Sequence, residues 1–315
     1  MITYVQQSLD RMCIGLATAS VRSGWRRPDQ SERAAELLAA PDLFAPKVPP
    51  AKLEFKSNRR FVFNSVVPSQ WDVNPTHGVF WRTGRDWKRK PAVILIHGWN
   101  GEMGYYFSFP GIQMALARRG ANALKFELPF HGFRRSRKRG DISNLISDDL
   151  VTMIEGVRHC LADILSLRIW LLEQGCPSVS LWGYSLGGWL AGLLSAHPEP
   201  FKAAVLMNAV ARMDIAMATL PFAKPVRESM AVSPVNMDRF SLHSLKPTTE
   251  RILIMEGVRD LFVPAATLDD LATHWPQAEL WRMRHSHISI CFGPLTLLRA
   301  VRWLARNVNE NSHGH

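Results

Sequence analysis

The stretch that decides the fold reads Val179-Ser180-Leu181-Trp182-Gly183-Tyr184-Ser185-Leu186-Gly187-Gly188-Trp189. Its apolar start, Val179 to Trp182, predicts a buried strand, and the apolar residues from Trp189 to Ala196 predict a helix. A sharp turn from strand to helix strains the residue at its apex and leaves little room two positions before and after it, where glycines stand. Ser185 therefore has the context of a nucleophile elbow, whereas the motif alone fits an ordinary glycine-rich turn equally well.

The sequence around this stretch alternates apolar runs with helical segments. The helix from Leu150 to Leu165 has its apolar residues on one stripe and begins after Ser147-Asp148-Asp149. Strand, helix and strand at this spacing predict right-handed crossovers and an α/β fold with a mostly parallel sheet covered on both faces. The runs that predict buried strands are Ala92 to Ile96, Asn122 to Glu127, Val179 to Trp182, Ala203 to Met207, Ile252 to Met255 and Leu280 to Met283.

The chain is predicted to hold one catalytic domain, residues 59–308, with an antiparallel edge formed by Arg60 to Val67 and Gly78 to Thr83. Residues 1–58 contain two helix-prone pieces, Thr3 to Ser20 and Ser31 to Ala40, and predict an N-terminal helical extension. Residues 211–245, rich in methionine and proline, are where a small cap over Ser185 would form. Residues 309–315 are polar and predict a disordered tail.

Composition favours a globular protein, because 47% of the 315 residues are hydrophobic and 21% are charged. The net charge of +11 is compatible with nucleic acid, an anionic membrane surface or an acidic substrate. The densest basic cluster, residues 134–139, lacks interleaved aromatic residues, which argues against nucleic acid. We interpret it as a solvated loop; the alternative is a loop that meets an anionic substrate or a phospholipid surface.

The cysteines, Cys13, Cys160, Cys176 and Cys291, are scattered without a Cys-x-x-Cys pair or clustered histidines. This spacing predicts neither a metal site nor a disulfide framework, and favours reduced thiols in the cytoplasm.

No apolar run in the sequence approaches the roughly 18 residues that a membrane-spanning helix needs. The N-terminus lacks the basic start of a signal peptide.

A serine nucleophile needs a base and an orienting acid later in the chain. Asp260 follows the strand Ile252 to Met255 in a glycine-containing loop and is the candidate acid, ahead of Asp214, Asp238, Asp269 and Asp270. Two candidate bases follow the last strand. His287 is favoured over His285 because it directly precedes the apolar start of the final helix.

The loop His97 to Gly101 directly follows the strand Ala92 to Ile96, where this architecture completes an oxyanion hole. We assign the two backbone donors to Trp99 and Leu186. His97 is interpreted mainly as a residue that fixes this loop. The residues expected to contact substrate are His97, Asn100, Tyr184, Met217 and Phe222.

These residues resemble the α/β-hydrolase superfamily of serine esterases, over roughly Arg60 to Asn307. The elbow, the His97-Gly98 loop, Asp260 and His287 have the order and strand context of that family. The resemblance implies about eight strands, a serine hydrolase mechanism and no cofactor. The lipase-type run of glycines after the oxyanion histidine is absent, since Trp99 and Asn100 stand there. The stretch Leu128 to Gly132 with the basic cluster after it, together with the double glycine that follows Ser185, is faintly similar to lipid deacylases of the family.

The expected function is hydrolysis of a small-molecule carboxylic ester, for example a lipid ester, through an acyl-serine intermediate. Two alternatives remain: an amidase or acyltransferase that uses the same Ser185, Asp260 and His287, and a ligand-binding protein that keeps the fold without catalysis. Sequence leaves the acyl length and the oligomeric state undetermined.

Overall fold

The computed structural model describes residues 2–21, 29–67, 69, 73–101, 104–135 and 145–309. The described residues form one nine-stranded sheet in the order β1-β2-β3-β5-β4-β6-β7-β8-β9. Neighbours from β1 to β5 pair antiparallel, and all later pairs are parallel. The strands are β1 (Glu54–Phe55), β2 (Arg60–Asn64), β3 (Pro75–Trp81), β4 (Ala92–Ile96), β5 (Asn122–Phe126), β6 (Val179–Tyr184), β7 (Ala203–Met207), β8 (Arg251–Gly257) and β9 (Ala278–Met283). The predicted α/β fold is confirmed, with one strand more than the eight expected.

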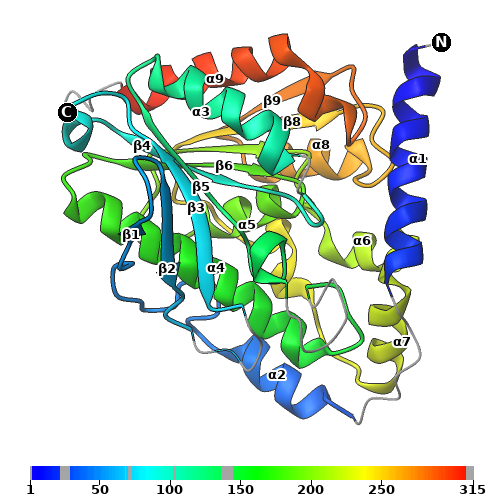
Figure 1. The fold of residues 1–315 in the computed structure, drawn as a ribbon. Helices are drawn as coiled ribbons and strands as arrows, with labels where there is room; N and C mark the ends of the chain where they lie inside the picture. Colours follow the sequence, from blue (N-terminus) through cyan, green and yellow to red (C-terminus); the bar gives the residue numbers. More distant parts are fainter. Residues whose placement is uncertain are drawn as a thin grey trace.

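Helices cover both faces of the sheet (Figure 1). The helices α3 and α9 lie on one face, and α4 and α5 lie on the other. The helices are α1 (Ile2–Ser20), α2 (Ser31–Ala39), α3 (Phe109–Ala117), α4 (Leu150–Glu173), α5 (Leu186–Leu194), α6 (Met213–Thr219), α7 (Lys224–Val232), α8 (Ala265–His274) and α9 (Pro294–Asn309). Short helical turns are η1 (Trp87–Arg89), η2 (Gly104–Ser108), η3 (Gly132–Arg134), η4 (Pro221–Ala223), η5 (Asp238–Phe240), η6 (Leu242–Ser244) and η7 (Ser289–Phe292).

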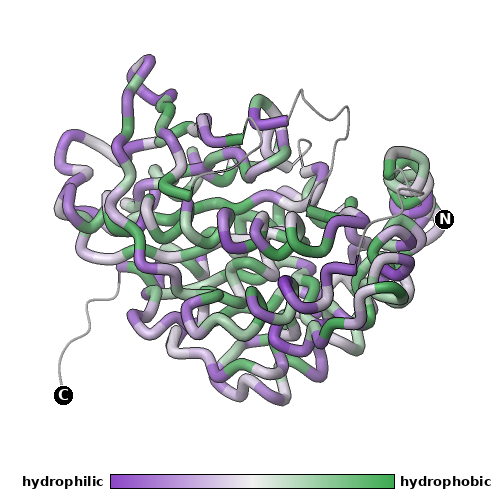
Figure 2. The backbone as a smooth tube through the Cα atoms, turned by 90° about the horizontal axis from the view of Figure 1, so that it is seen from below, coloured by the Kyte–Doolittle hydropathy of each residue, from purple (hydrophilic) through white to green (hydrophobic). Residues whose placement is uncertain are grey.

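The strand β4 shows why continuous apolar runs form the centre of this sheet. Val93 and Leu95 pack in the layer of α3 and α9, while Ala92, Ile94 and Ile96 pack in the layer of α4 and α5. Successive side chains of a strand point to opposite faces, so a strand buried on both sides needs apolar residues throughout. Figure 2 shows hydrophobic segments mostly in the interior of the molecule and hydrophilic segments mostly at its periphery. β9 differs from the prediction: its residues are exposed or half-buried, because it is the edge strand.

The predicted bounds hold for β4 and β7 and shift at other elements. α5 begins at Leu186, directly after Ser185, rather than at Trp189. α4 begins where expected, because the Asp149 carboxylate accepts the N–H of Thr152 at 2.9 Å and caps the helix.

The N-terminal region is joined to the sheet. β1 lies within residues 1–58, so the sheet begins before the predicted domain boundary. α2 packs on α4, and α1 lies at one edge of the molecule in both views (Figures 1 and 2).

At the C-terminal end of the chain, Asn309 is the last residue of α9 rather than the start of a tail, and residues 310–315 lie outside the described residues. Within the described residues, no helix combines the length and apolar character needed to cross a membrane.

Candidate active site

Ser185 lies between the last residue of β6 and the first residue of α5, with φ 55° and ψ −117°. Positive φ is rare for a residue other than glycine, so the turn is strained. A Cβ on Gly183 would lie 2.0 Å from the carbonyl oxygen of Gly187, and a Cβ on Gly187 would lie 2.2 Å from that of Ile96. Glycine is required at both positions because backbone atoms occupy the space of a side chain. This is the geometry of the predicted elbow.

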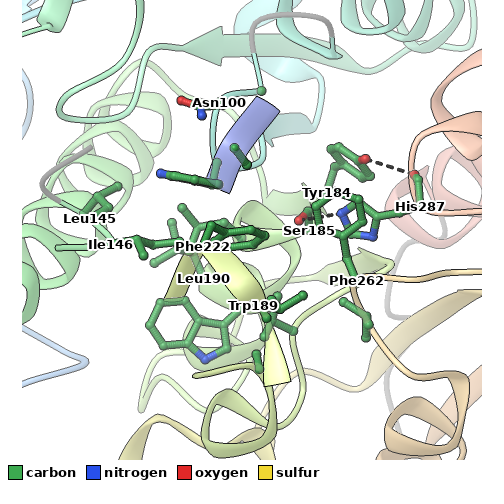
Figure 3. A pocket seen from close by; sticks show the side chains of 18 of the residues that line it. Asn100, Leu145, Ile146, Tyr184, Ser185, Trp189, Leu190, Phe222, Phe262 and His287 are labelled. Atoms are coloured by element: carbon green, nitrogen blue, oxygen red, sulfur yellow. Dashed lines mark hydrogen bonds between the residues drawn. The ribbon is translucent and has the colours of Figure 1, made fainter. Parts of the chain in front are cut away.

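The structure brings the predicted nucleophile, base and acid together. Nε2 of His287 lies 2.9 Å from Oγ of Ser185 (Figure 3), and Nδ1 of His287 lies 2.6 Å from Oδ2 of Asp260. His285 is not part of this chain of contacts, since its ring nitrogens lie 3.3 Å from Oγ of Ser289 and 3.2 Å from Oγ1 of Thr296. The geometry therefore selects His287 over His285.

Asp260 is held in a loop that buries its carboxylate. Oδ1 accepts the backbone N–H groups of Phe262 at 2.7 Å and Val263 at 2.8 Å, and the side chain is 2% exposed. Burial raises the pKa of Asp260, and the neighbouring His287 and the two N–H groups oppose that rise. The ring of Phe262 stacks on the ring of His287 with centroids 4.4 Å apart. The imidazole of His287 is thus fixed by a hydrogen bond at its edge and by an aromatic ring on its face.

The loop after β4 approaches Ser185 closely. A Cβ on Gly98 would lie 3.0 Å from Cβ of Ser185, so the loop passes directly over the elbow. Leu186 is the first residue of α5, and the N–H groups of a first helical turn have no partner within the helix. The ring of Trp99 stacks on Phe222 with centroids 4.7 Å apart. These positions are compatible with the two oxyanion donors assigned from the sequence.

The predicted contact of His97 with substrate is wrong in this structure. His97 is 2% exposed and does not line the cavity beside Ser185. Its Nε2 accepts the N–H of Leu128 at 3.0 Å, so Nδ1 carries the hydrogen and donates to the carbonyl of Gly98 at 2.7 Å. His97 fixes the loop instead.

An apolar cavity of about 490 Å³ opens beside Ser185. It extends from the Ser185–His287 pair to Leu145 and Ile146 (Figure 3). The other predicted contact residues all line it, namely Asn100, Tyr184, Met217 and Phe222, and so do Trp99 and Leu186. The Tyr184 hydroxyl also donates to the backbone carbonyl of His287 at 2.9 Å. Residues 211–245 supply the cavity wall at Met213, Ala216, Met217, Leu220, Phe222, Met237 and Phe240.

Residues 93–307 match the sequence profile described as the alpha/beta hydrolase family. The chain belongs to this family. No curated protein matches the sequence.

Several solved structures share the fold of this hydrolase-family chain. Est1E from Butyrivibrio proteoclasticus with bound ferulic acid has a TM-score of 0.58 at 15% identity, over 75% of this chain and 96% of its own. The Pyrococcus furiosus esterase Pf2001 has a TM-score of 0.55 at 17% identity, over 83% of this chain and 100% of its own. The Pyrococcus horikoshii acylaminoacyl peptidase has a TM-score of 0.58 at 12% identity, over 85% of this chain and 44% of its own. At these identities the likeness concerns the fold.

The basic loop of this family member is not simply solvated, as the sequence suggested. Arg134 is fully buried, and its guanidinium donates to the Asp163 carboxylate at 2.8 Å and to Nε2 of His159 at 3.1 Å. Arg135 is exposed and lines the cavity. Residues 136–144, with the other three basic side chains of the cluster, lie outside the described residues.

One buried carboxylate beside the triad escaped the sequence analysis. Asp10 of α1 is fully buried and accepts the backbone N–H groups of His287 and Ile288, each at 3.0 Å. Its partners lie about 250 to 280 residues away in the chain, so no local pattern marks it. The signal was indirect: Asp10 lies in the predicted helix Thr3 to Ser20, just before its apolar run.

Among the described residues, one group of side chains could hold a metal ion. His243, Asp270 and His274 place ligand atoms within 4.8 Å of one another. None of the three lines the cavity of this family member, so the group is separate from the candidate active site.

Proposed function

We propose that the protein is a serine hydrolase that cleaves a carboxylic ester with an apolar acyl group, through an acyl-serine intermediate. One observation carries the proposal: a chain of hydrogen bonds from Asp260 through His287 ends on Ser185, and Ser185 faces an apolar cavity. A serine hydroxyl becomes a strong nucleophile when a base takes its proton and an acid orients that base. The esterases among the solved structures of similar fold support an ester as the bond.

The reaction follows from the positions of these side chains. His287 Nε2 accepts the proton of Ser185 Oγ while Oγ bonds to the carbonyl carbon of the ester. The backbone N–H groups of Leu186 and Trp99 stabilise the oxyanion, and loss of one such donor typically lowers kcat by about 100 to 1000-fold. His287 then donates the proton to the alcohol oxygen as the ester C–O bond breaks, which leaves the acyl-serine. A water molecule next gives a proton to His287 as it bonds to the acyl carbon, and His287 returns that proton to Ser185 Oγ as the acid leaves. Asp260 holds the imidazole tautomer that makes this possible.

The cavity wall supports an apolar acyl group as the part of the substrate that is recognised. Met217 of α6 and Phe222 of η4 are both less than a tenth exposed and line the cavity beside Ser185. Each methylene buried there would gain about 0.8 kcal/mol, which favours longer chains until the cavity is full. Methionine adapts to chains of different shape.

Labelling with a fluorophosphonate tests the nucleophile. We expect one label per chain, mapped to Ser185 by mass spectrometry and lost in Ser185→Ala. Ser195→Ala is the matched control, because Ser195 is buried at the end of the same helix and does not line the cavity. A folded wild-type protein that takes up no label would contradict the proposal and favour a ligand-binding protein without catalysis.

A series of p-nitrophenyl esters with increasing acyl length tests the acyl cavity. Phe222→Ala should shift the preferred length upward and raise kcat/KM for the longest esters by about 4 to 15-fold, the gain expected from one or two further buried methylenes. Met230→Ala, in the same segment but not among the lining residues, is the control. An unchanged preference in a folded Phe222→Ala protein would argue against this acyl site.

A further inference from the structure

The helix α1 contacts both loops of the candidate triad through one carboxylate. Oδ2 of Asp10 accepts the backbone N–H groups of His287 at 3.0 Å and Leu261 at 3.1 Å. Oδ1 accepts the N–H of Ile288 at 3.0 Å and the hydroxyl of Ser286 at 2.8 Å. A carboxylate has about four acceptor positions, and all four partners are donors. One side chain therefore joins the loop of the base to the loop of the acid.

A second contact from the same face of α1 reaches the same two loops. The backbone carbonyl oxygen of Gln6, one turn before Asp10, lies 3.0 Å from Oγ of Ser286, so the single hydroxyl hydrogen of Ser286 is shared between this carbonyl and Asp10. The side-chain oxygen of Gln6 accepts from the guanidinium of Arg259, the residue before Asp260, at 2.8 Å. Residues four apart lie on one face of a helix. The docking of α1 is thus specific to the segments that carry the base and the acid.

The main chain of His287 depends on this helix. Its carbonyl accepts the hydroxyl of Tyr184, and its ring contacts Asp260 and Ser185, whereas its N–H donates to Asp10. The same helix reaches the cavity, because Cys13, Leu16 and Ala17 are among the lining residues. α1 therefore contacts both the loops of the candidate triad and the cavity beside Ser185.

We propose that Asp10 is a positioning residue for catalysis, which holds His287 and Asp260 in the geometry that Ser185 requires. This inference rests on the proposed serine hydrolase function. Asp10 does not touch Ser185 or the cavity, so it acts through the two loops. A displacement of reacting groups by about 1 Å can lower a rate by about 100-fold. The four hydrogen bonds to the Asp10 carboxylate are the contacts that hold the two loops against such a displacement.

The test compares the rate and the stoichiometry of fluorophosphonate labelling in wild type, Asp10→Asn and Asp149→Asn. In Asp10→Asn the amide NH₂ group faces donors where an oxygen stood. We expect one label per chain but a labelling rate constant lowered by about 10 to 100-fold, with kcat lowered in parallel and KM within about 3-fold. Asp149→Asn also changes a buried carboxylate, but at the N-cap of α4 and outside the cavity lining, and should label at the wild-type rate.

Two results would overturn the positioning role while the proposed function stands: a wild-type rate in Asp10→Asn, or fewer labelled chains that each react at the wild-type rate. The second result is that of a residue needed only for folding. If Asp10→Asn does not fold, Ser286→Ala decides, because it removes one donor to Asp10 and should slow labelling by about 3 to 10-fold. An unchanged rate there overturns the proposal. A wild-type protein that does not label overturns the proposed function and the positioning role together.

Discussion

Two side-chain networks of this molecule are each built around a buried carboxylate, and only one of them opens onto the cavity. The first joins Asp260, His287 and Ser185. The second joins Arg134 to Asp163 and His159, with both Arg134 and Asp163 fully buried. Both connect segments that are distant in the sequence, and both hold groups with shifted pKa values.

The comparison of the two networks shows that a buried ionisable group indicates a functional site only where its network is accessible to substrate. Ser185 and His287 line the cavity, whereas Arg134, Asp163 and His159 do not. Arg134 instead donates to the backbone carbonyls of two separate segments, at Val73 and Glu127, each at 2.7 Å. We interpret the first network as catalytic and the second as a structural clamp between these segments and α4.

Changing the acid of the first network should give the largest effect. In Asp260→Asn the amide oxygen can still accept the two loop N–H groups, but the NH₂ group faces Nδ1 of His287 and selects the wrong imidazole tautomer. We expect kcat to fall by about 10⁴-fold at pH 7. The urea midpoint should change little, because a buried charge is replaced by a neutral group of the same shape.

The matched variant for that experiment lies in the other network. Asp163→Asn removes a buried carboxylate from the same kind of environment, and the folded protein should keep kcat within about 3-fold, since Asp163 lies outside the cavity lining. Full activity in Asp260→Asn, measured with a short-chain p-nitrophenyl ester, would remove Asp260 from the mechanism.

The two networks also differ in how far sequence predicts them. The sequence shows apolar runs that predict the strands before Ser185, Asp260 and His287. Because parallel strands have their carboxyl ends at one edge of the sheet, the proximity of these three residues could be predicted. The partner of Arg134 could not be predicted, because the sequence of the basic cluster is typical of a solvated loop, and only the structure places Asp163 of α4 beside it. Asp10 escaped for the same reason. A buried contact between segments that are distant in the sequence produces no periodic pattern of residues near either partner.

Breaking the second network should give the next largest effect, on stability rather than activity. Arg134→Met leaves Asp163 as a buried carboxylate without its cation, and removal of one partner of a buried ion pair costs about 3 to 5 kcal/mol. The measurement is urea unfolding, with kcat of the folded fraction expected to stay near the wild-type value.

A double variant separates the lost charge pair from lost packing. Adding Asp163→Leu to Arg134→Met removes the unpaired charge and should recover part of the lost free energy of unfolding. The recovery should be incomplete because the carbonyls of Val73 and Glu127 lose their donor. A double variant no more stable than Arg134→Met would show that the charge of Asp163 is not what destabilises the single variant.

The smallest effect is a dependence of stability on pH that arises in the second network. Burial, together with the nearby Arg134, lowers the pKa of His159 to about 4, while Asp163 opposes that shift. The ring accepts a hydrogen bond from the Arg134 guanidinium, which requires neutral imidazole. In the unfolded chain the pKa of histidine is about 6.5. Between these two values the unfolded state binds a proton that the folded state does not, so the free energy of unfolding falls as the pH falls from about 6.5 to about 4.

Urea unfolding at pH 7.5 and pH 4.5 measures this contribution in wild type and His159→Gln. Glutamine does not titrate, and its side-chain oxygen can accept from Arg134. We expect wild type to lose about 2 to 3 kcal/mol more than the variant between the two pH values, at about 1.4 kcal/mol per unit of pKa difference. Because other groups titrate equally in both proteins, only the difference counts. Equal losses would mean that His159 is protonated in the folded protein at pH 4.5. Because a protonated ring cannot accept the hydrogen bond from Arg134, the guanidinium would then have to move away from it.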